Sequence, residues 1–215
     1  MAESSLIVNI RPDSRRAKRL QVKMEPGRTL SVHEAAAKAL KLAEGQEAQW
    51  AELRAQARRA EDEAALQAAL RLLKYADRTR RELEQRLRQQ GFDQGPRAAA
   101  LSKLEQYGYL DDVRFARRFV EGRRAGRPRG RRALAWELKC KGIDHETVET
   151  VLDELLTEEA ELDMASELLR RRLSRIKQVD ERVRRRLYGL LVRRGFDQET
   201  IRAAFGQVLP SPEDD

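Results

Sequence analysis

Near the N-terminus, apolar and polar residues alternate with the period of two that a half-buried β-strand requires. In residues 20–24, the apolar Leu20, Val22 and Met24 are separated by polar residues. A second apolar run covers residues 6–10, and the Pro-Asp-Ser segment at 12–14 favours a turn between the two runs. The pattern predicts a small β-hairpin, which needs a helix to pack against because two strands alone are marginally stable.

Helical patterning begins soon after this hairpin. Ser31 and Glu34 have the spacing of a capping box, in which a serine and a glutamate three residues apart bond to each other's backbone N–H groups. This spacing predicts a helix over residues 35–42 that starts at Ser31. A second helix is predicted over residues 49–60.

From residue 63 onward the pattern is helical throughout, and one signature recurs. A Gly-Phe-Asp or Gly-Ile-Asp sequence begins at Gly91, Gly142 and Gly195, which are 51 and 53 residues apart. Apolar residues lie at the same distances from each glycine, namely eight and four residues before it and 10 and 13 residues after it. These positions are Leu83, Leu134 and Leu187; Leu87, Leu138 and Leu191; Leu101, Leu152 and Phe205; and Leu104, Leu155 and Val208.

The recurring signature is typical of a sharp joint between two helices. Leucines four residues apart share a helix face. Glycine ends the helix because it adopts the left-handed conformation without a Cβ penalty, and the following aspartate caps the next helix. Thr79 and Glu82 form a further capping-box match at the start of the helix before Gly91. One more helix precedes each joint, at about residues 63–76, 112–124 and 158–176.

The predicted fold class is therefore mainly α: an elongated array of three tandem three-helix repeats, preceded by a small β-hairpin and helix. The predicted boundaries are residues 1–62 for the N-terminal extension and 63–110, 111–156 and 157–215 for repeats 1, 2 and 3.

The charge is unevenly distributed along the chain. The net charge is +8, yet residues 114–141 alone hold 11 basic and two acidic residues, so the whole surplus lies in this stretch. Gly126, Pro128 and Gly130 predict a basic loop between two helices. Exposed guanidinium groups suit phosphates and carboxylates, so this segment is the first candidate binding site, although a solvated arginine-rich surface is the simpler alternative. Its candidates are Arg114, Arg117, Arg118, Arg123, Arg124, Arg127, Arg129, Arg131 and Arg132.

A second basic cluster follows in repeat 3. Its binding candidates are Arg171, Arg172, Arg175 and Lys177, and more arginines follow at Arg184, Arg185, Arg186, Arg193 and Arg194. Because acidic residues lie nearby at 158–163, salt-bridged helix faces explain most of this cluster, and we rank it second as a binding site.

Signatures of catalysis are missing from the chain. The two histidines, His33 and His145, are 112 residues apart, and no metal-binding spacing or glycine-rich phosphate loop is present. A single cysteine, Cys140, excludes an internal disulfide and favours the reducing cytoplasm. No apolar run is long enough to span a membrane. We therefore expect a cytoplasmic, monomeric protein without catalytic activity, cofactor, bound metal or membrane contact.

The most specific motif is Gly-Tyr-Leu-Asp-Asp-Val-Arg-Phe-Ala at residues 108–116, which resembles the central motif of the RecX family. The resemblance continues through Glu137-Leu138 and Lys141-Gly142-Ile143, and covers residues 68–156 well and 157–209 more loosely. The N-terminal sixty residues are not part of it. The resemblance implies tandem three-helix repeats and a protein that binds the RecA filament on single-stranded DNA. It also implies lowered recombinase, ATPase and co-protease activity of RecA.

Two other functions stay open from the residues alone. The basic segments also fit a helical protein that binds single-stranded or double-stranded DNA independently of RecA. A generic helical adaptor would also present long charged faces, and only the motif at 108–116 argues strongly against it.

Overall fold

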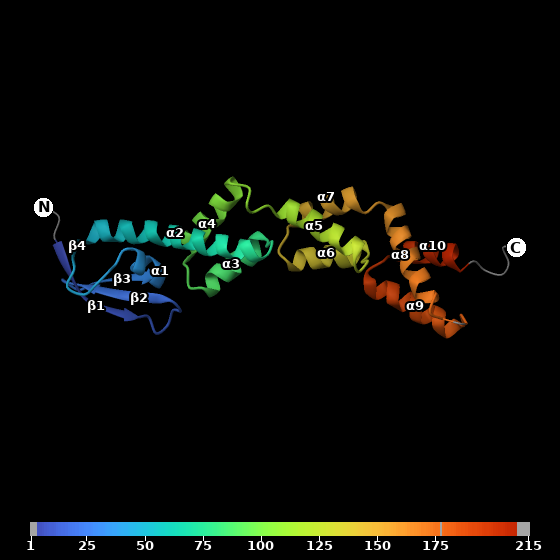
Figure 1. The fold of residues 1–215 in the computed structure, drawn as a ribbon, viewed down its shortest axis with the longest axis horizontal. Coiled ribbons are helices and arrows are strands. Elements are labelled where there is room, and N and C mark those ends of the chain that lie inside the picture. Colours follow the sequence, from blue (N-terminus) through green and yellow to red (C-terminus); the bar gives the residue numbers. More distant parts are fainter. Residues whose placement is uncertain (1–3, 177, 210–215) are drawn as a thin grey trace. The chain divides into compact units, whose positions relative to one another are not determined.

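A computed structural model describes residues 4–176 and 178–209, and these residues are predominantly helical (Figure 1). The chain divides into two compact units, residues 1–111 and residues 112–215. The first unit contains a β-sheet and repeat 1, and the second contains repeats 2 and 3. The predicted class, mainly α with three three-helix repeats and a small N-terminal β region, is confirmed.

The predicted hairpin is part of a larger sheet. Strands β1 (Ser4–Pro12) and β2 (Arg19–Met24) pair antiparallel, with Ile10 opposite Val22. Two further strands, β3 (Arg28–His33) and β4 (Glu47–Gln49), complete a sheet of order β3-β2-β1-β4. Ile7, Val22, Met24 and Val32 are buried with residues of α1 (Glu34–Ala39) and of the start of α2 (Trp50–Tyr75), so helices supply the apolar partner that two strands lack.

The predicted helix start at Ser31 is wrong. Ser31 belongs to β3, and its hydroxyl accepts a hydrogen bond from Nε of the buried Arg19 at 3.0 Å. The helix starts three residues later, and the side chain of His33 caps it by accepting from the N–H of Ala35 at 3.2 Å. Pairing of β3 with β2 therefore overrides the local capping-box signal.

Repeat 1 is built on a long helix. Helix α2 runs without interruption from Trp50 to Tyr75, so the two helices predicted over 49–60 and 63–76 are one. No glycine or proline separates them, and the intervening residues are compatible with a helix. Helices α3 (Arg80–Gln89) and α4 (Gln94–Gln106) complete the repeat around the predicted core leucines at 83, 87, 101 and 104. The Thr79 capping box of α3 is confirmed.

Repeats 2 and 3 share one hydrophobic core. Repeat 2 comprises α5 (Asp112–Ala125), α6 (Arg131–Cys140) and α7 (His145–Leu155). Repeat 3 comprises α8 (Glu158–Leu173), α9 (Glu181–Arg194) and α10 (Gln198–Val208). The leucines predicted from the repeat pattern at 134, 138, 152, 187 and 191 are all buried in this core, which extends through both repeats.

The three glycine joints have the predicted backbone conformation. Gly91, Gly142 and Gly195 have φ angles of +90°, +88° and +87°. After the second and third glycines, Asp144 and Asp197 cap the next helix as expected, each accepting a backbone N–H at 2.7 to 2.8 Å. Asp93 departs from the prediction because it makes no capping hydrogen bond. Its carboxylate instead pairs with Arg16 and, at 3.2 Å, with Arg19.

The joint at Gly195 is also where repeat 2 attaches to repeat 3. The N–H of Gly130 donates to the carbonyl of Arg194 at 3.0 Å. The N–H of Arg131, at the first position of α6, donates to the carboxylate of the buried Glu161 on α8 at 2.7 Å. The close approach leaves no room for side chains, since a Cβ on Gly195 would overlap Ala133.

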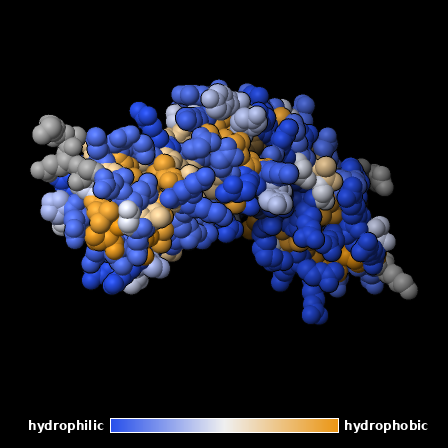
Figure 2. All heavy atoms as spheres, turned by 60° about the vertical axis from the view of Figure 1, so that its left-hand side comes forward, coloured by the Kyte–Doolittle hydropathy of each residue, from blue (hydrophilic) through white to orange (hydrophobic). Residues whose placement is uncertain are grey.

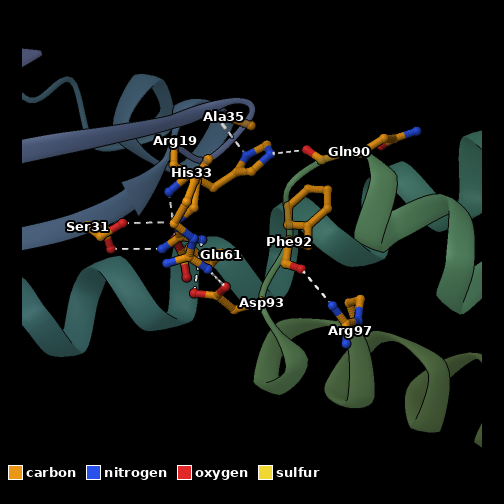
Figure 3. A network of polar contacts seen from close by, with 10 residues as sticks. Arg19, Ser31, His33, Ala35, Glu61, Gln90, Phe92, Asp93 and Arg97 are labelled. Atoms are coloured by element: carbon orange, nitrogen blue, oxygen red, sulfur yellow. Dashed lines mark hydrogen bonds and ion pairs between the residues drawn. The ribbon is translucent and has the colours of Figure 1, made fainter. Parts of the chain in front are cut away.

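The sheet attaches to repeat 1 by the same type of contact, in which an N–H at the start of a helix donates to a buried glutamate beside a glycine joint (Figure 3). The N–H of His33, which immediately precedes α1, donates to the carboxylate of the buried Glu61 on α2 at 2.6 Å. Nε2 of His33 donates to the carbonyl of Gln90 at 2.9 Å, as Gly130 does to the carbonyl before Gly195. A Cβ on Gly91 would overlap the carbonyl of Ala17. The sheet with α1 thus contacts repeat 1 in the way that repeat 2 contacts repeat 3.

Replacement of Gly91 by alanine tests the joint of the first unit. Gly91→Ala should lower the free energy of unfolding by more than about 2 kcal/mol, because the methyl group adds a backbone overlap to the ~1 kcal/mol cost of a left-handed residue. Gly45→Ala is the matched control, since Gly45 has a φ of +84° and a methyl group added there would meet nothing within 4 Å. Urea unfolding measures both variants, and equal losses would contradict a close contact at Gly91.

Glu161 makes the stability of the second joint depend on pH. Burial raises the pKa of this carboxyl above its ordinary value of 4.5, although the hydrogen bond from Arg131 opposes the shift. The folded protein therefore keeps the proton on Glu161 to a higher pH than the unfolded chain does. The contribution of Glu161 to the free energy of unfolding falls as the pH rises through the window above about 4.5. Glu161→Gln removes the ionisation and keeps an oxygen that accepts from Arg131.

The expected result is that wild type and Glu161→Gln have similar urea stability at about pH 4, and that the wild type becomes progressively less stable than the variant towards pH 7. Stability curves that stay parallel across this range would contradict the raised pKa.

Candidate nucleic-acid interface

The first candidate segment adopts the predicted arrangement of a helix, a loop and a helix start. Its first five arginines lie on α5, which ends at Ala125, and α6 begins at Arg131. Arg127 and Arg129 lie in the loop between the two helices, where Gly130 is the residue before α6. The chemistry of the segment then depends on which guanidinium groups are already engaged within the fold.

Several of these arginines are engaged by carboxylates of repeat 2. Arg117 forms a bidentate pair with Glu154, with a closest approach of 2.8 Å. Arg123 and Arg129 both reach Glu137, at 3.0 and 3.3 Å. Salt bridges of this kind hold α5 and the loop against α6 and α7, so these side chains have a structural role that the sequence pattern did not reveal.

Arg131 is the most fully paired member of the segment. It contacts the carboxylates of Glu149 at 2.8 Å and Asp153 at 2.7 Å, and these two partners raise its pKa although burial opposes them. Arg124 donates to the carbonyl of Leu155 at 2.9 Å. By contrast, Arg127 and Arg132 are exposed and form no ion pair within the described part of the chain. Arg114 and Arg118 are also exposed, on the surface of α5.

The second candidate cluster forms a concave basic site. A groove of about 450 Å³ lies between the C-terminal end of α8 and one side of α9. We call it the α8–α9 groove. Its lining combines four arginines with three apolar residues and includes no carboxylate: Arg172, Arg175, Ile176, Arg186, Leu187, Leu190 and Arg193. None of these four arginines forms an ion pair among residues 4–176 and 178–209.

The groove contains some, but not all, of the residues ranked second from the sequence. Arg172 and Arg175 line it, whereas Arg171 lies outside and pairs with Glu167 at 2.7 Å. Lys177 lies outside the described residues. The acidic residues of 158–163, expected to neutralise this cluster, lie at the N-terminal end of α8, more than one helical turn from Arg172. Arg186 and Arg193 join the groove because α9 packs beside α8, which sequence spacing did not indicate.

The basic loop of repeat 2 extends the positive field of this groove. Arg194 lies at the joint, where it donates to the carbonyl of Pro128 at 3.3 Å. Burial lowers the pKa of Arg194, and repulsion from Arg129, Arg172 and Arg127 lowers it further. Four like charges from two repeats therefore act on one another, and a bound anion would relieve their repulsion.

The arrangement suits a phosphate backbone. Guanidinium groups present paired N–H donors that match phosphate oxygens, and the apolar floor of Leu187 and Leu190 offers a surface for sugars or base edges. In the view of Figure 2, hydrophilic residues dominate the surface and apolar ones appear in small patches. Within the described ranges, no group of three or more histidine, cysteine or acidic residues is placed to hold a metal ion, and no helix is long and apolar enough to cross a membrane.

Two neighbouring arginines at the start of α6 test the difference between a side chain paired within the fold and an exposed one. Arg131→Ala should lower the free energy of unfolding by about 1–2 kcal/mol, because it removes a half-buried side chain and its ion pairs with Glu149 and Asp153. Arg132→Ala, which removes the same charge from an exposed position, should change it by less than about 0.5 kcal/mol. Urea unfolding of the two variants side by side provides the measurement, and equal losses would contradict the assigned pairing.

Comparison with known proteins places the chain in a family. Models of the first, second and third three-helix domains of RecX match residues 65–112, 111–152 and 158–205. The regulatory protein RecX of Mycobacterium avium is 42% identical over 139 residues, covering 64% of this chain and 80% of that protein. The regulatory protein RecX of Thermobifida fusca is 39% identical over 155 residues, covering 67% and 83%.

Solved structures show the same fold. A crystal structure of regulatory protein RecX superposes with a TM-score of 0.66 at 20% identity, covering 96% of this chain and 100% of that one. The RecX of Lactobacillus salivarius gives a TM-score of 0.64 at 23% identity, covering 69% and 96%. Three matched domains, in the order of the three observed repeats, show that this chain belongs to the RecX family of regulatory proteins.

Proposed function

We propose that this protein binds the RecA filament on single-stranded DNA and modulates it, in the inhibitory direction, during DNA repair and the SOS response. The affected activities are recombination, ATP hydrolysis and co-protease activity, and the protein acts by binding rather than by catalysis, in the cytoplasm. Membership of a family of regulatory proteins supports this proposal. RecA as the partner is what the resemblance of the motif at residues 108–116 to the RecX family implies.

The observation that carries the proposal is the α8–α9 groove, whose four arginines form no ion pair within the described residues, together with the exposed Arg127. A filament presents both DNA phosphates and protein carboxylates, and unpaired guanidinium groups bind either. The groove has four arginines and no carboxylate in its lining, whereas much of the 114–132 segment is neutralised within repeat 2. We therefore assign the principal contact with the filament to repeat 3 and the adjoining loop.

A second candidate function is DNA binding that needs no RecA. The same unpaired arginines favour it, since a phosphate backbone alone satisfies them. The two functions differ in whether the recombinase is needed for binding. A pull-down distinguishes them when the protein is offered RecA alone, DNA alone, and RecA assembled on single-stranded DNA with a non-hydrolysable nucleotide.

The groove gives a direct test of filament regulation. Arg172→Glu/Arg175→Glu should weaken inhibition of the DNA-dependent ATPase of RecA by about tenfold or more, because two attractive contacts become repulsive. The matched control is Arg54→Glu/Arg58→Glu, which makes the same charge change on exposed positions of α2. Titration of each variant into an ATPase assay, with circular dichroism to verify folding, provides the measurement.

If Arg172→Glu/Arg175→Glu inhibits RecA as strongly as the wild type does, repeat 3 does not provide the principal contact with the filament. Equal loss in the groove and control variants would mean that net charge, rather than this groove, determines filament binding.

A further inference from the structure

Helix α9 has a second basic groove on its opposite side. This groove, of about 430 Å³, lies between α9 and α10, and we call it the α9–α10 groove. Its lining is Glu181, Arg184, Arg185, Tyr188, Ile201, Arg202 and Phe205. At 100° per residue, the α9 residues of this groove and those of the α8–α9 groove point about 180° apart around the helix axis. One helix therefore has arginines along both flanks.

Comparison with repeat 2 shows that the second groove has lost its internal neutralisation. Shifting residue numbers by the 53-residue period aligns Arg131 with Arg184. In repeat 2, Arg131 is held by Glu149 and Asp153. The aligned residues of repeat 3 are Arg202 and Gly206, so one carboxylate is replaced by a like charge and the other by no side chain.

The remaining carboxylate in the α9–α10 groove does not compensate for this. Glu181 pairs with Arg185 at 3.3 Å, and both side chains are well exposed. Arg184 and Arg202 form no ion pair within residues 4–176 and 178–209, although both line the same groove. Two unpaired cations line this groove, and four more line the groove about 180° around the helix, so an anionic partner could contact α9 from both sides.

Helical spacing places Arg182, Arg185 and Gly189 on the outward strip between the two grooves. Gly189 has no side chain of its own, and the guanidinium of Arg193 lies over it, so the strip carries positive charge at its centre. Helix α9 is 14 residues long, or about 21 Å. A helix with its side chains is about 10–12 Å wide, and the major groove of B-form DNA is about 12 Å wide with a phosphate backbone on each edge.

We propose that α9 lies in the major groove of double-stranded DNA, with phosphates of one strand at the α8–α9 groove and phosphates of the other strand at the α9–α10 groove. The proposal rests on the anion-binding role given above to the α8–α9 groove, and adds a second site and a second ligand to it. A single strand has one backbone and fills one groove. Double-stranded RNA has a deep, narrow major groove that excludes the helix.

The experiment compares three ligands of about 20 nucleotides or base pairs: duplex DNA, single-stranded DNA and duplex RNA, each with a fluorescent label. Binding of the full chain, without RecA, is followed by anisotropy between about 50 and 200 mM salt. The variants are Arg186→Glu/Arg193→Glu for the first flank and Arg184→Glu/Arg202→Glu for the second. Arg54→Glu/Arg58→Glu on α2 is again the matched control.

Each flank variant should lower duplex DNA affinity at least tenfold. The corresponding neutral variants, Arg186→Gln/Arg193→Gln and Arg184→Gln/Arg202→Gln, should each reduce the slope of log affinity against log salt by about 1.8, since each phosphate contact contributes about 0.9. Only the first flank should affect single-stranded DNA, and duplex RNA should bind more weakly than duplex DNA. The glutamine variants also guard against loss of folding, which circular dichroism monitors.

The proposal is overturned if Arg184→Glu/Arg202→Glu leaves duplex DNA affinity unchanged, or if it weakens single-stranded and duplex binding equally. The ATPase assay with RecA on the same variants keeps the two proposals separate. Filament inhibition that persists in Arg184→Glu/Arg202→Glu, together with unchanged duplex affinity, refutes the duplex site alone.

Discussion

The structure depends on a close backbone contact that glycine alone permits. At Gly91 and at Gly195, the helix ends in the left-handed conformation, and the preceding part of the chain packs against the glycine without space for a methyl group. A buried glutamate, Glu61 or Glu161, then accepts an N–H from the start of the helix that has approached. Hydrogen bonds to a buried carboxylate are strong, so the contact determines both the distance and the direction of the neighbouring element.

This contact also determines where positive charge accumulates. Because the start of α6 lies on the joint at Gly195, the loop arginines before it are held near Arg194 and Arg172. Burial lowers the pKa of Arg194, and repulsion from these arginines lowers it further. In repeat 2 the arginines are largely balanced by carboxylates on α6 and α7. In repeat 3, like charges stand on both sides of α9. The same three-helix framework therefore supports two charge arrangements. In repeat 2 most arginines are paired with carboxylates, and in repeat 3 the arginines beside α9 are left to interact with anions.

Local signals predicted most of the fold. Glycine followed by an apolar residue and aspartate specifies a joint through its own backbone, and the leucines around it report one helix face, so the repeats were visible without tertiary information. The failures have a common origin in contacts between distant residues. Ser31 bonds to Arg19 within the sheet, and Asp93 pairs with Arg16 and Arg19, so neither side chain caps a helix. The site was harder to predict, because the counting of charges along the chain does not reveal that Glu154 reaches Arg117 or that Arg186 and Arg193 face Arg172.

Helix α2 has a consequence for how the first unit responds to load. Its N-terminal part covers the sheet and its C-terminal part forms the core of repeat 1, in one uninterrupted element of 26 residues, or about 39 Å. A helix curves only gently, so α2 holds the sheet and repeat 1 at a fixed separation. Near its middle, Glu61 also bonds to Arg19 and His33 of the sheet. A force on the sheet therefore moves repeat 1 with it, because one continuous helix, and no flexible linker, joins the two.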